Sequence, residues 1–219
     1  MKSPIRVSWR TEIVPVILLA ASLVASFYFY AHFPDQVVIH WDIAGQPNGY
    51  GSRALAAYFF PCLLIAIYAL FLALPFLDPK KDRYQEFAPT YHNFKNILIL
   101  ALTVLYFLAS LANLGWVVPL DYYVPFIIGV LFFIIGSQLT NIKPNWFLGI
   151  RTPWTLSSET VWTKTHRLGG RLFMICGLLM ALTGLLPVSW RAFIFIAIMA
   201  ILLIGTISYS YVIYVQEKH

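Results

Sequence analysis

The sequence predicts an all-α polytopic membrane protein with six transmembrane helices and both termini on the cytoplasmic side. Of its 219 residues, 60% are hydrophobic and 11% are charged, whereas an average soluble domain has about 25% charged residues. Six stretches lack Asp, Glu, Lys and Arg, and each is close to or above the roughly 20 apolar residues that span a bilayer. Backbone amides in hydrocarbon must be satisfied within the segment, which favours helices. The six stretches lie near residues 13–31, 54–77, 96–118, 124–142, 172–188 and 192–215.

The first apolar stretch follows Lys2, Arg6 and Arg10 and therefore resembles a signal peptide as well as a helix. It is about 19 residues long, ends in the bulky run Phe27–Tyr30 and has no small-x-small cleavage site. We therefore expect it to be retained as the first transmembrane helix.

The distribution of basic residues predicts the orientation, because cytoplasmic loops are enriched in Lys and Arg. If the N-terminus is inside, only Arg53 and Arg191 of the fifteen basic residues lie outside. The net charge of +6 thus reflects the orientation in the membrane and favours contact with anionic membrane lipids. It is not evidence for nucleic-acid binding. The thirteen bases assigned to the cytoplasmic side are Lys2, Arg6, Arg10, Lys80, Lys81, Arg83, Lys95, Lys143, Arg151, Lys164, Arg167, Arg171 and Lys218.

The first loop, residues 32–53, is predicted to form a compact extracellular cap. Gly45, Pro47, Asn48, Gly49 and Gly51 indicate turns with positive φ. Residues 37–41 before them are β-prone, and in an extended chain the side chains at positions 40 and 42 point to one face while those at 39 and 41 point to the other.

The cytoplasmic loops differ in character. Residues 78–95 have mixed charge and are interpreted as a solvated linker. Residues 143–171 are rich in aromatic residues between Pro144 and Pro153, which disfavours regular helix there. A helix is expected to begin near Ser157, with Glu159 in its first turn. Along it, Lys164, Arg167 and Arg171 form a basic stripe, while Trp162, His166, Gly169 and Phe173 form a face that packs inward.

The sequence offers little support for catalysis. Ionisable residues at membrane depth usually mark transport or proton relay, and the six stretches contain none, which disfavours an ion-coupled transporter. HExxH and GxSxG motifs are absent, and Cys62 and Cys176 have no metal or redox spacing. We expect no enzymatic activity and no cofactor. Two alternatives remain open: a membrane enzyme or metal-dependent factor, and a small transporter or channel.

The metal alternative rests on His40 and Asp42, with Asp35 and His32 as further ligands. Two residues in a turn-rich loop also fit a hydrogen-bonded cap in which His40 and Asp42 brace the backbone. The cap is the favoured interpretation, and the two residues are only weak metal candidates.

Two segments resemble a known family. The first loop, PDQVVIHWDIAGQPNGYGS, is similar to the domain of unknown function at the N-terminus of SdpI-type bacterial proteins. The run NWFLGIRTPWTLSSETVWTKTHRLGGR is similar to the C-terminal SdpI motif and is the more specific match. With the flanking helices the resemblance covers about residues 13–70 and 125–215 of a single membrane domain, 1–219. In this division, residues 1–95 form the N-terminal segment with the outer loop, and 96–219 form the SdpI-like segment.

The resemblance implies a multi-pass plasma-membrane immunity protein that protects a bacterium from a secreted toxic peptide. It further implies a receptor that sequesters a cytoplasmic ArsR-like repressor. Asp42 stands where Asn is common in the family, which alters charge or ligand strength. The outer-loop ligand-binding candidates are Pro34, Asp35, His40, Trp41, Asp42, Gly45 and Gly49. The cytoplasmic motif comprises Trp146, Phe147, Gly149, Arg151, Thr152, Pro153, Trp154, Thr155, Ser157, Trp162, His166, Arg167 and Gly169.

Overall fold

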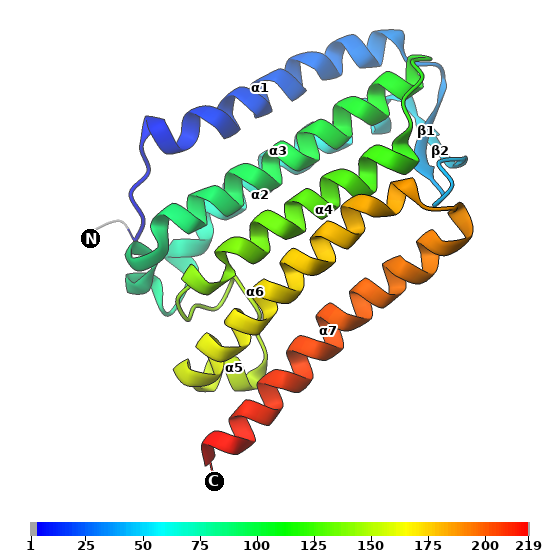
Figure 1. Cartoon of the computed structure of the whole chain (residues 1–219). Coiled ribbons are helices and arrows are strands. Elements are labelled where there is room, and N and C mark those ends of the chain that lie inside the picture. Colours follow the sequence, from blue (N-terminus) through cyan, green and yellow to red (C-terminus); the bar gives the residue numbers. More distant parts are fainter. Residues whose placement is uncertain (1–3, 219) are drawn as a thin grey trace.

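The computed structural model describes residues 4–218 as a bundle of long helices with a small β-hairpin at one end (Figure 1). Within these residues, six helices are long and apolar enough to cross a membrane, which confirms the predicted number. The long helices are α1 (Trp9–His32), α2 (Arg53–Leu77), α3 (Ala88–Asn113), α4 (Leu120–Gln138), α6 (Glu159–Leu182) and α7 (Val188–Lys218). The shorter elements are strands β1 (Gln36–Trp41) and β2 (Pro47–Ser52), helix α5 (Pro153–Ser157), and the 3₁₀ turns η1 (Lys81–Phe87), η2 (Leu139–Asn141) and η3 (Thr183–Leu185).

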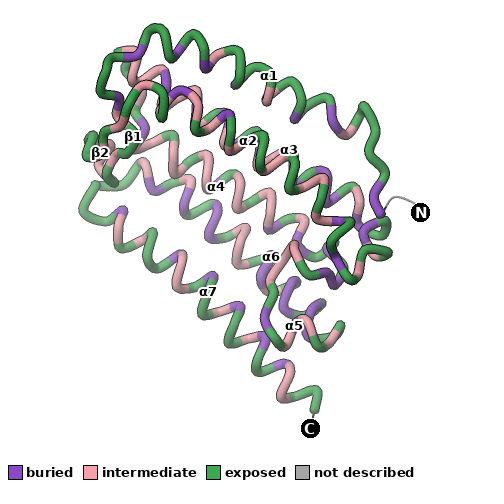
Figure 2. The backbone as a smooth tube through the Cα atoms, turned by 180° about the vertical axis from the view of Figure 1, so that it is seen from behind, coloured by how far each residue is buried: buried purple, intermediate pink, exposed green. Residues whose placement is uncertain are grey.

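Both chain ends lie at the end of the bundle opposite the hairpin (Figure 1). We call these the termini end and the hairpin end. Large apolar side chains are exposed along the outer helices, among them Phe27 on α1 and Phe193 on α7, and Figure 2 shows exposed residues along both of these helices. Such surface is expected where lipid replaces water. Which end faces the cytoplasm stays a prediction.

The helices form two groups. Helices α1, α2 and α3 pack on one another, α6 packs between α4 and α7, and α3 meets α4 where the groups join. Glycines give α4 and α6 the most extensive contact: a Cβ built on Gly136 would lie 2.7 Å from Gly170 O, and one on Gly177 2.6 Å from Gly129 O. Small residues of this kind let the backbones of membrane helices approach closely.

The first loop departs from the expectation of a purely α-helical fold. It folds as an antiparallel hairpin, and the β-prone run is strand β1 as predicted. Of its glycines only Gly45 has positive φ, at 76°, whereas Gly49 and Gly51 are extended members of β2. The prediction of several positive-φ turns here was wrong because the second half of the loop pairs with the first.

Several predicted helix bounds also need correction. Ser158, not Ser157, caps α6 by accepting from Val161 N, although Glu159 does lie in the first turn. Helix α6 ends at Leu182, so the predicted end of the fifth segment, residue 188, lies too far toward the C-terminus. Helix α3 begins at Ala88, which places Lys95 inside a helix instead of in a loop.

Residues 78–95 are an ordered part of the core, not a solvated linker. Tyr84 and Phe87 of η1 are buried in one cluster with Tyr91 and Trp162. Asp78 is 2% exposed and accepts hydrogen bonds from Tyr84 OH and Trp146 N, both at 2.9 Å. The loop therefore joins α2 and α3 to the segment that precedes α6.

Candidate functional site

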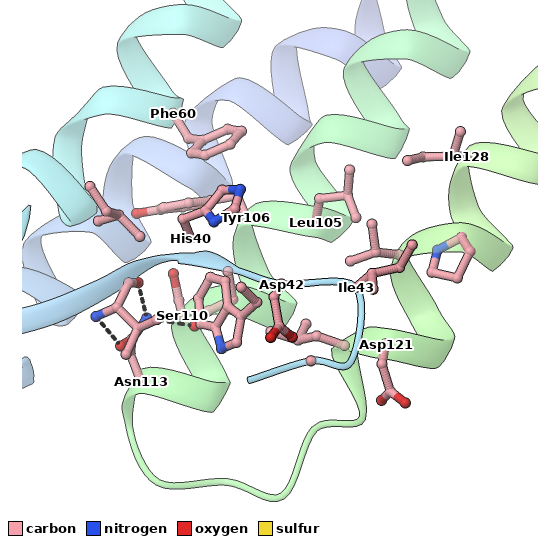
Figure 3. A pocket seen from close by; sticks show the side chains of 18 of the residues that line it. His40, Asp42, Ile43, Phe60, Leu105, Tyr106, Ser110, Asn113, Asp121 and Ile128 are labelled. Carbon is pink, nitrogen blue, oxygen red and sulfur yellow. Dashed lines mark hydrogen bonds between the residues drawn. The ribbon is translucent and has the colours of Figure 1, made fainter. Parts of the chain in front are cut away.

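A cavity of about 780 Å³ lies beneath β1 at the hairpin end, where the two helix groups meet (Figure 3). Its walls come from α2, α3, α4 and α7, with single residues from α6 and η3. Most of the lining is apolar, which suits an apolar ligand with a few polar groups to orient it. Representative lining residues are Phe60, Leu105, Tyr106, Ile128, Met180 and Phe195.

Asn113 at the end of α3 holds β1 over the cavity. Its Oδ1 accepts from Val38 N at 2.9 Å, and its Nδ2 donates to Val38 O at 2.9 Å (Figure 3). The side-chain amide thus pairs with the strand as a neighbouring strand would. This role of Asn113 could not be predicted from the sequence, since a polar residue near a helix end gives no sign of its partner.

Asp42 closes the turn between the strands. Its Oδ1 accepts from Ala44 N at 2.9 Å and from Gln46 N at 2.8 Å, and Gly45 provides the positive φ. His40 Nδ1 lies 2.5 Å from Asn48 Oδ1 on β2. Asp42 thus braces the backbone as predicted, whereas His40 contacts the side chain of Asn48.

The candidate metal ligands are dispersed. Asp35 is paired with Arg53 at the base of the hairpin, and His32 Nδ1 donates to Tyr28 O at 2.8 Å. Among residues 4–218 no group of three or more His, Cys, Asp or Glu side chains is placed to hold a metal ion.

The outer-loop candidates separate into two sets. His40, Trp41, Asp42 and Gly45 line the cavity, whereas Pro34, Asp35 and Gly49 do not. The predicted alternation along the strand was wrong: positions 38–43 all line the same cavity. The register of the hairpin shifts on both sides of His40, and such irregularities break strict alternation.

A charged pair completes the cavity wall. Arg191 NH1 donates to Asp121 Oδ2 at 2.9 Å, while its Nε and NH2 donate to Leu186 O and Gly184 O, each at 3.0 Å. Arg191 thereby joins α7 to α4 and to the preceding turn. The cavity thus combines apolar walls with the charged side chains of Asp42, Asp121 and Arg191 in its lining.

The cytoplasmic motif lies at the termini end and is largely buried. Asn145 is 0% exposed; its Oδ1 accepts from Phe147 N and Leu148 N, and its Nδ2 donates to Lys143 O and Leu148 O. This one side chain satisfies four backbone groups of a segment that has no regular structure. Asn145 was not among the predicted residues.

His166 links this segment to α6. Its Nδ1 donates to Trp162 O at 2.8 Å and its Nε2 accepts from Ile150 N at 3.0 Å, so the ring is a fully satisfied neutral imidazole. Trp162 stacks on it at 4.1 Å. Gly149 fits here because its φ is 106° and a Cβ would collide with His166 Nε2. The predicted packing role of Trp162 and His166 is confirmed by these contacts.

Helix α5 joins the motif to α7. Thr152 and Thr155 form a capping box, and Thr152 Oγ1 donates to Ser210 Oγ at 3.0 Å. Trp154 lies 5.1 Å from Tyr211, ring to ring. Gly169 faces Ile150 with no room for a side chain. The motif residues left exposed are Trp146, Arg151, Pro153, Ser157 and Arg167.

One ionisable cluster was missed by the sequence analysis. Glu12 of α1 is ion-paired with Lys95 of α3 and accepts from Tyr68 OH of α2 at 2.9 Å, while His92 Nδ1 lies 3.7 Å from Glu12 Oε1. The expectation that the membrane segments contain no ionisable residue was therefore wrong. Positions 12 and 95 fall one residue outside the predicted stretches, which were ended at the first charge.

Comparison with known proteins agrees with this geometry. Residues 141–210 match the SdpI/YfhL protein family and residues 17–65 match a domain of unknown function, DUF1648. In these two segments the chain is similar to SdpI-type proteins. It is 26% identical over 202 residues to the immunity protein SdpI of Bacillus subtilis, covering 92% of this chain and 95% of the relative. No solved structure matches.

Both matched regions contribute to the lining of the cavity, and the SdpI region also contains the cytoplasmic motif at the termini end. The DUF1648 region contains the hairpin and the part of α2 that lines the cavity, and the SdpI region contains the motif and most of α6 and α7. Similarity to the Bacillus relative over nearly the whole chain, with six apolar helices, makes the chain a multi-pass protein of the bacterial plasma membrane.

Proposed function

We propose that this protein protects the bacterium that makes it from a secreted, membrane-active killing peptide. The observation that carries the proposal is the similarity to an immunity protein along 92% of the chain. The cavity beneath the hairpin is the site we assign to the peptide, because it is apolar and its lining includes the hairpin and the start of α2 from the DUF1648 region.

The chemistry of the cavity supports an amphipathic ligand. An apolar side chain of the peptide enters between Phe60 and Ile128, while its polar groups meet Asp42 and Asp121. The cavity lies at the hairpin end, which is predicted to face the outside of the cell from the distribution of basic residues. A secreted peptide would therefore reach it without crossing the bilayer.

The test is protection of a sensitive strain. A Bacillus subtilis strain without its own immunity protein SdpI is transformed with this gene and exposed to the toxic peptide against which that immunity protein acts. Survival is expected for the unaltered chain, with purified protein binding the same peptide. Killing at the control rate together with no detectable binding would contradict the proposal.

Two alanines on α2 make a matched pair for locating the site. Ala56 lines the cavity, whereas Ala69 is exposed on the outside of the same helix. Ala56→Phe fills the cavity with a ring and is expected to weaken peptide binding at least about tenfold, a loss of about 1.4 kcal/mol. Ala69→Phe is expected to bind as the unaltered chain does; equal binding by both variants would place the peptide elsewhere.

We further propose that the termini end sequesters an ArsR-like repressor through the exposed part of the cytoplasmic motif. Trp146 is 46% exposed, and Arg151 beside it donates to Trp146 O at 2.7 Å. An exposed aromatic residue next to an arginine is typical of a protein-binding surface. Co-purification of a repressor encoded beside the gene is expected with the unaltered chain and lost in Trp146→Ala; equal recovery with both would contradict this role.

A further inference from the structure

A groove of about 290 Å³ lies between α6 and α7 at the termini end, away from the cavity beneath the hairpin. Lys164, Arg167 and Arg171 line it, and their spacing of three and four residues puts them on one face of α6. Leu168, Tyr209 and Ile213 supply the rest of the lining, two of them from α7. The groove thus combines three positive charges with apolar and aromatic surface.

The three bases have no counter-ion among residues 4–218. By contrast, Arg53, Arg83, Lys95 and Arg191 are each ion-paired with a carboxylate. Like charges at this spacing on a helix repel one another. An anion from outside the chain would relieve that repulsion.

The position of the bases along α6 identifies the anion. Arg171 directly precedes the apolar stretch that begins at Leu172, so the three bases lie where the helix enters the hydrocarbon. Tyrosine is enriched at this level of a membrane, and Tyr209 faces the same groove. The negative charges at this depth are the phosphates of lipid headgroups.

The same face of α6 continues as apolar surface. Ile175 and Leu178, four and seven residues beyond Arg171, are 59% and 56% exposed. Acyl chains that extend from a phosphate held by the bases would lie against these side chains. Basic pockets between transmembrane helices bind anionic lipid headgroups in this way.

We propose that the groove between α6 and α7 is a binding site for one anionic phospholipid, with its phosphate held by Lys164, Arg167 and Arg171. The site is independent of the peptide cavity.

Titration of the purified protein with phosphatidylglycerol or phosphatidylcholine, followed by native mass spectrometry, tests this site. One phosphatidylglycerol is expected to stay bound under conditions that strip phosphatidylcholine. Arg167→Gln and Arg171→Gln are each expected to weaken retention about fivefold, and the double variant about thirtyfold. The matched control is Lys81→Gln/Lys143→Gln, which removes two exposed bases of the termini end outside the groove and is expected to keep full affinity.

Three results would overturn the proposal. One is equal retention of phosphatidylglycerol by the double variant and by the control. Another is displacement of the lipid by inorganic phosphate or glycerol 3-phosphate at the same concentration, which would indicate a site for free anions. The last is unchanged lipid affinity in the double variant with loss of a soluble protein partner. Circular dichroism without added lipid checks that the variants are folded.

Discussion

Glu12 and Lys95 form an ion pair across the interface of α1 and α3, and the lysine side chain is only 1% exposed. Breaking such a pair leaves an uncompensated charge out of water, at a cost of about 3–5 kcal/mol. Lys95→Met is therefore expected to lower the unfolding free energy by about that amount. Glu12→Gln/Lys95→Met is expected to recover much of the loss, because no charge is then left alone. Denaturant titration in detergent measures the unfolding free energy of the single and the double variant.

Lys81→Met is the control for the ion pair, since that lysine is exposed on η1 and is expected to change stability by less than about 0.5 kcal/mol. A double variant as unstable as the sum of its two single variants would show that Glu12 and Lys95 do not act as a pair.

Gly149 and Gly115 allow two reasons for requiring glycine to be distinguished: a left-handed backbone conformation and a lack of space for a side chain. Both have positive φ, 106° and 89°, but a Cβ on Gly149 would collide with His166 while one on Gly115 would meet nothing within 4 Å. Gly115→Ala is expected to cost about 1–2 kcal/mol, the strain of a left-handed residue. Gly149→Ala should cost clearly more and reduce the amount of folded protein. Thermal unfolding measures the stability of both variants. An equal loss of stability in Gly149→Ala and Gly115→Ala would mean that the segment around Gly149 can shift to accommodate the new Cβ.

The glycines between α4 and α6 are expected to be intolerant of even one methyl group. A Cβ on Gly136 would lie 2.7 Å from two backbone atoms of α6, so Gly136→Ala must separate the helices. A loss of about 1–3 kcal/mol follows from overpacking. In Gly205→Ala on α7 the new Cβ would meet only Leu172 at 3.4 Å, and this variant is expected to be neutral or up to about 1 kcal/mol more stable.

Asn113 is expected to control the mobility of the hairpin. Asn113→Leu leaves the N–H and C=O of Val38 without their partner, so amide hydrogen exchange in residues 36–41 should become faster. The control is Asn93→Leu. Asn93 is exposed on the other half of α3, and its replacement removes a side-chain hydrogen bond to Gln138 of α4. Unchanged exchange at the hairpin in the Asn113 variant would assign its docking to the apolar contacts alone.

The orientation of the chain is testable with single cysteines in a background without Cys62 and Cys176. Gln46→Cys at the hairpin end is expected to react with a membrane-impermeant maleimide in intact cells. Ser157→Cys at the termini end is expected to react only after permeabilisation. The opposite pattern would invert the topology and remove the argument that a secreted peptide reaches the cavity directly.

Composition and hydropathy were sufficient to predict the six helices, because a membrane helix needs only a long apolar run. Strand β1 could be predicted for a similar reason, because it is a local β-prone run. The pairing of β2 with β1 could not be predicted, since glycines such as Gly49 and Gly51 are compatible with turns and with extended chain alike. The end of α6 was misplaced because apolar residues continue past Leu182 into the turn.

The site was harder to predict for a physical reason. Asp42 could be interpreted from its neighbours in sequence, since its partners are two and four residues away. Asn113 and Val38 are 75 residues apart, and Arg191 and Asp121 are 70 apart. Contacts of that separation depend on how helices pack. Similarly, the run that resembles the family motif begins at Asn145, but nothing in the sequence indicated that this side chain stabilises the segment from within.

The contacts of α5 also bear on the order in which the chain becomes structured during synthesis. The partners that hold Thr152 and Trp154 are Ser210 and Tyr211, and Ser158 Oγ donates to Glu217 Oε2 at 2.5 Å. Ser210 and Glu217 follow their partners by 58 and 59 residues in the chain. The cytoplasmic motif therefore cannot dock on α7 until the chain has been synthesised past residue 210, and a chain truncated before that residue would keep its six apolar segments nearly intact but lack these contacts at the termini end.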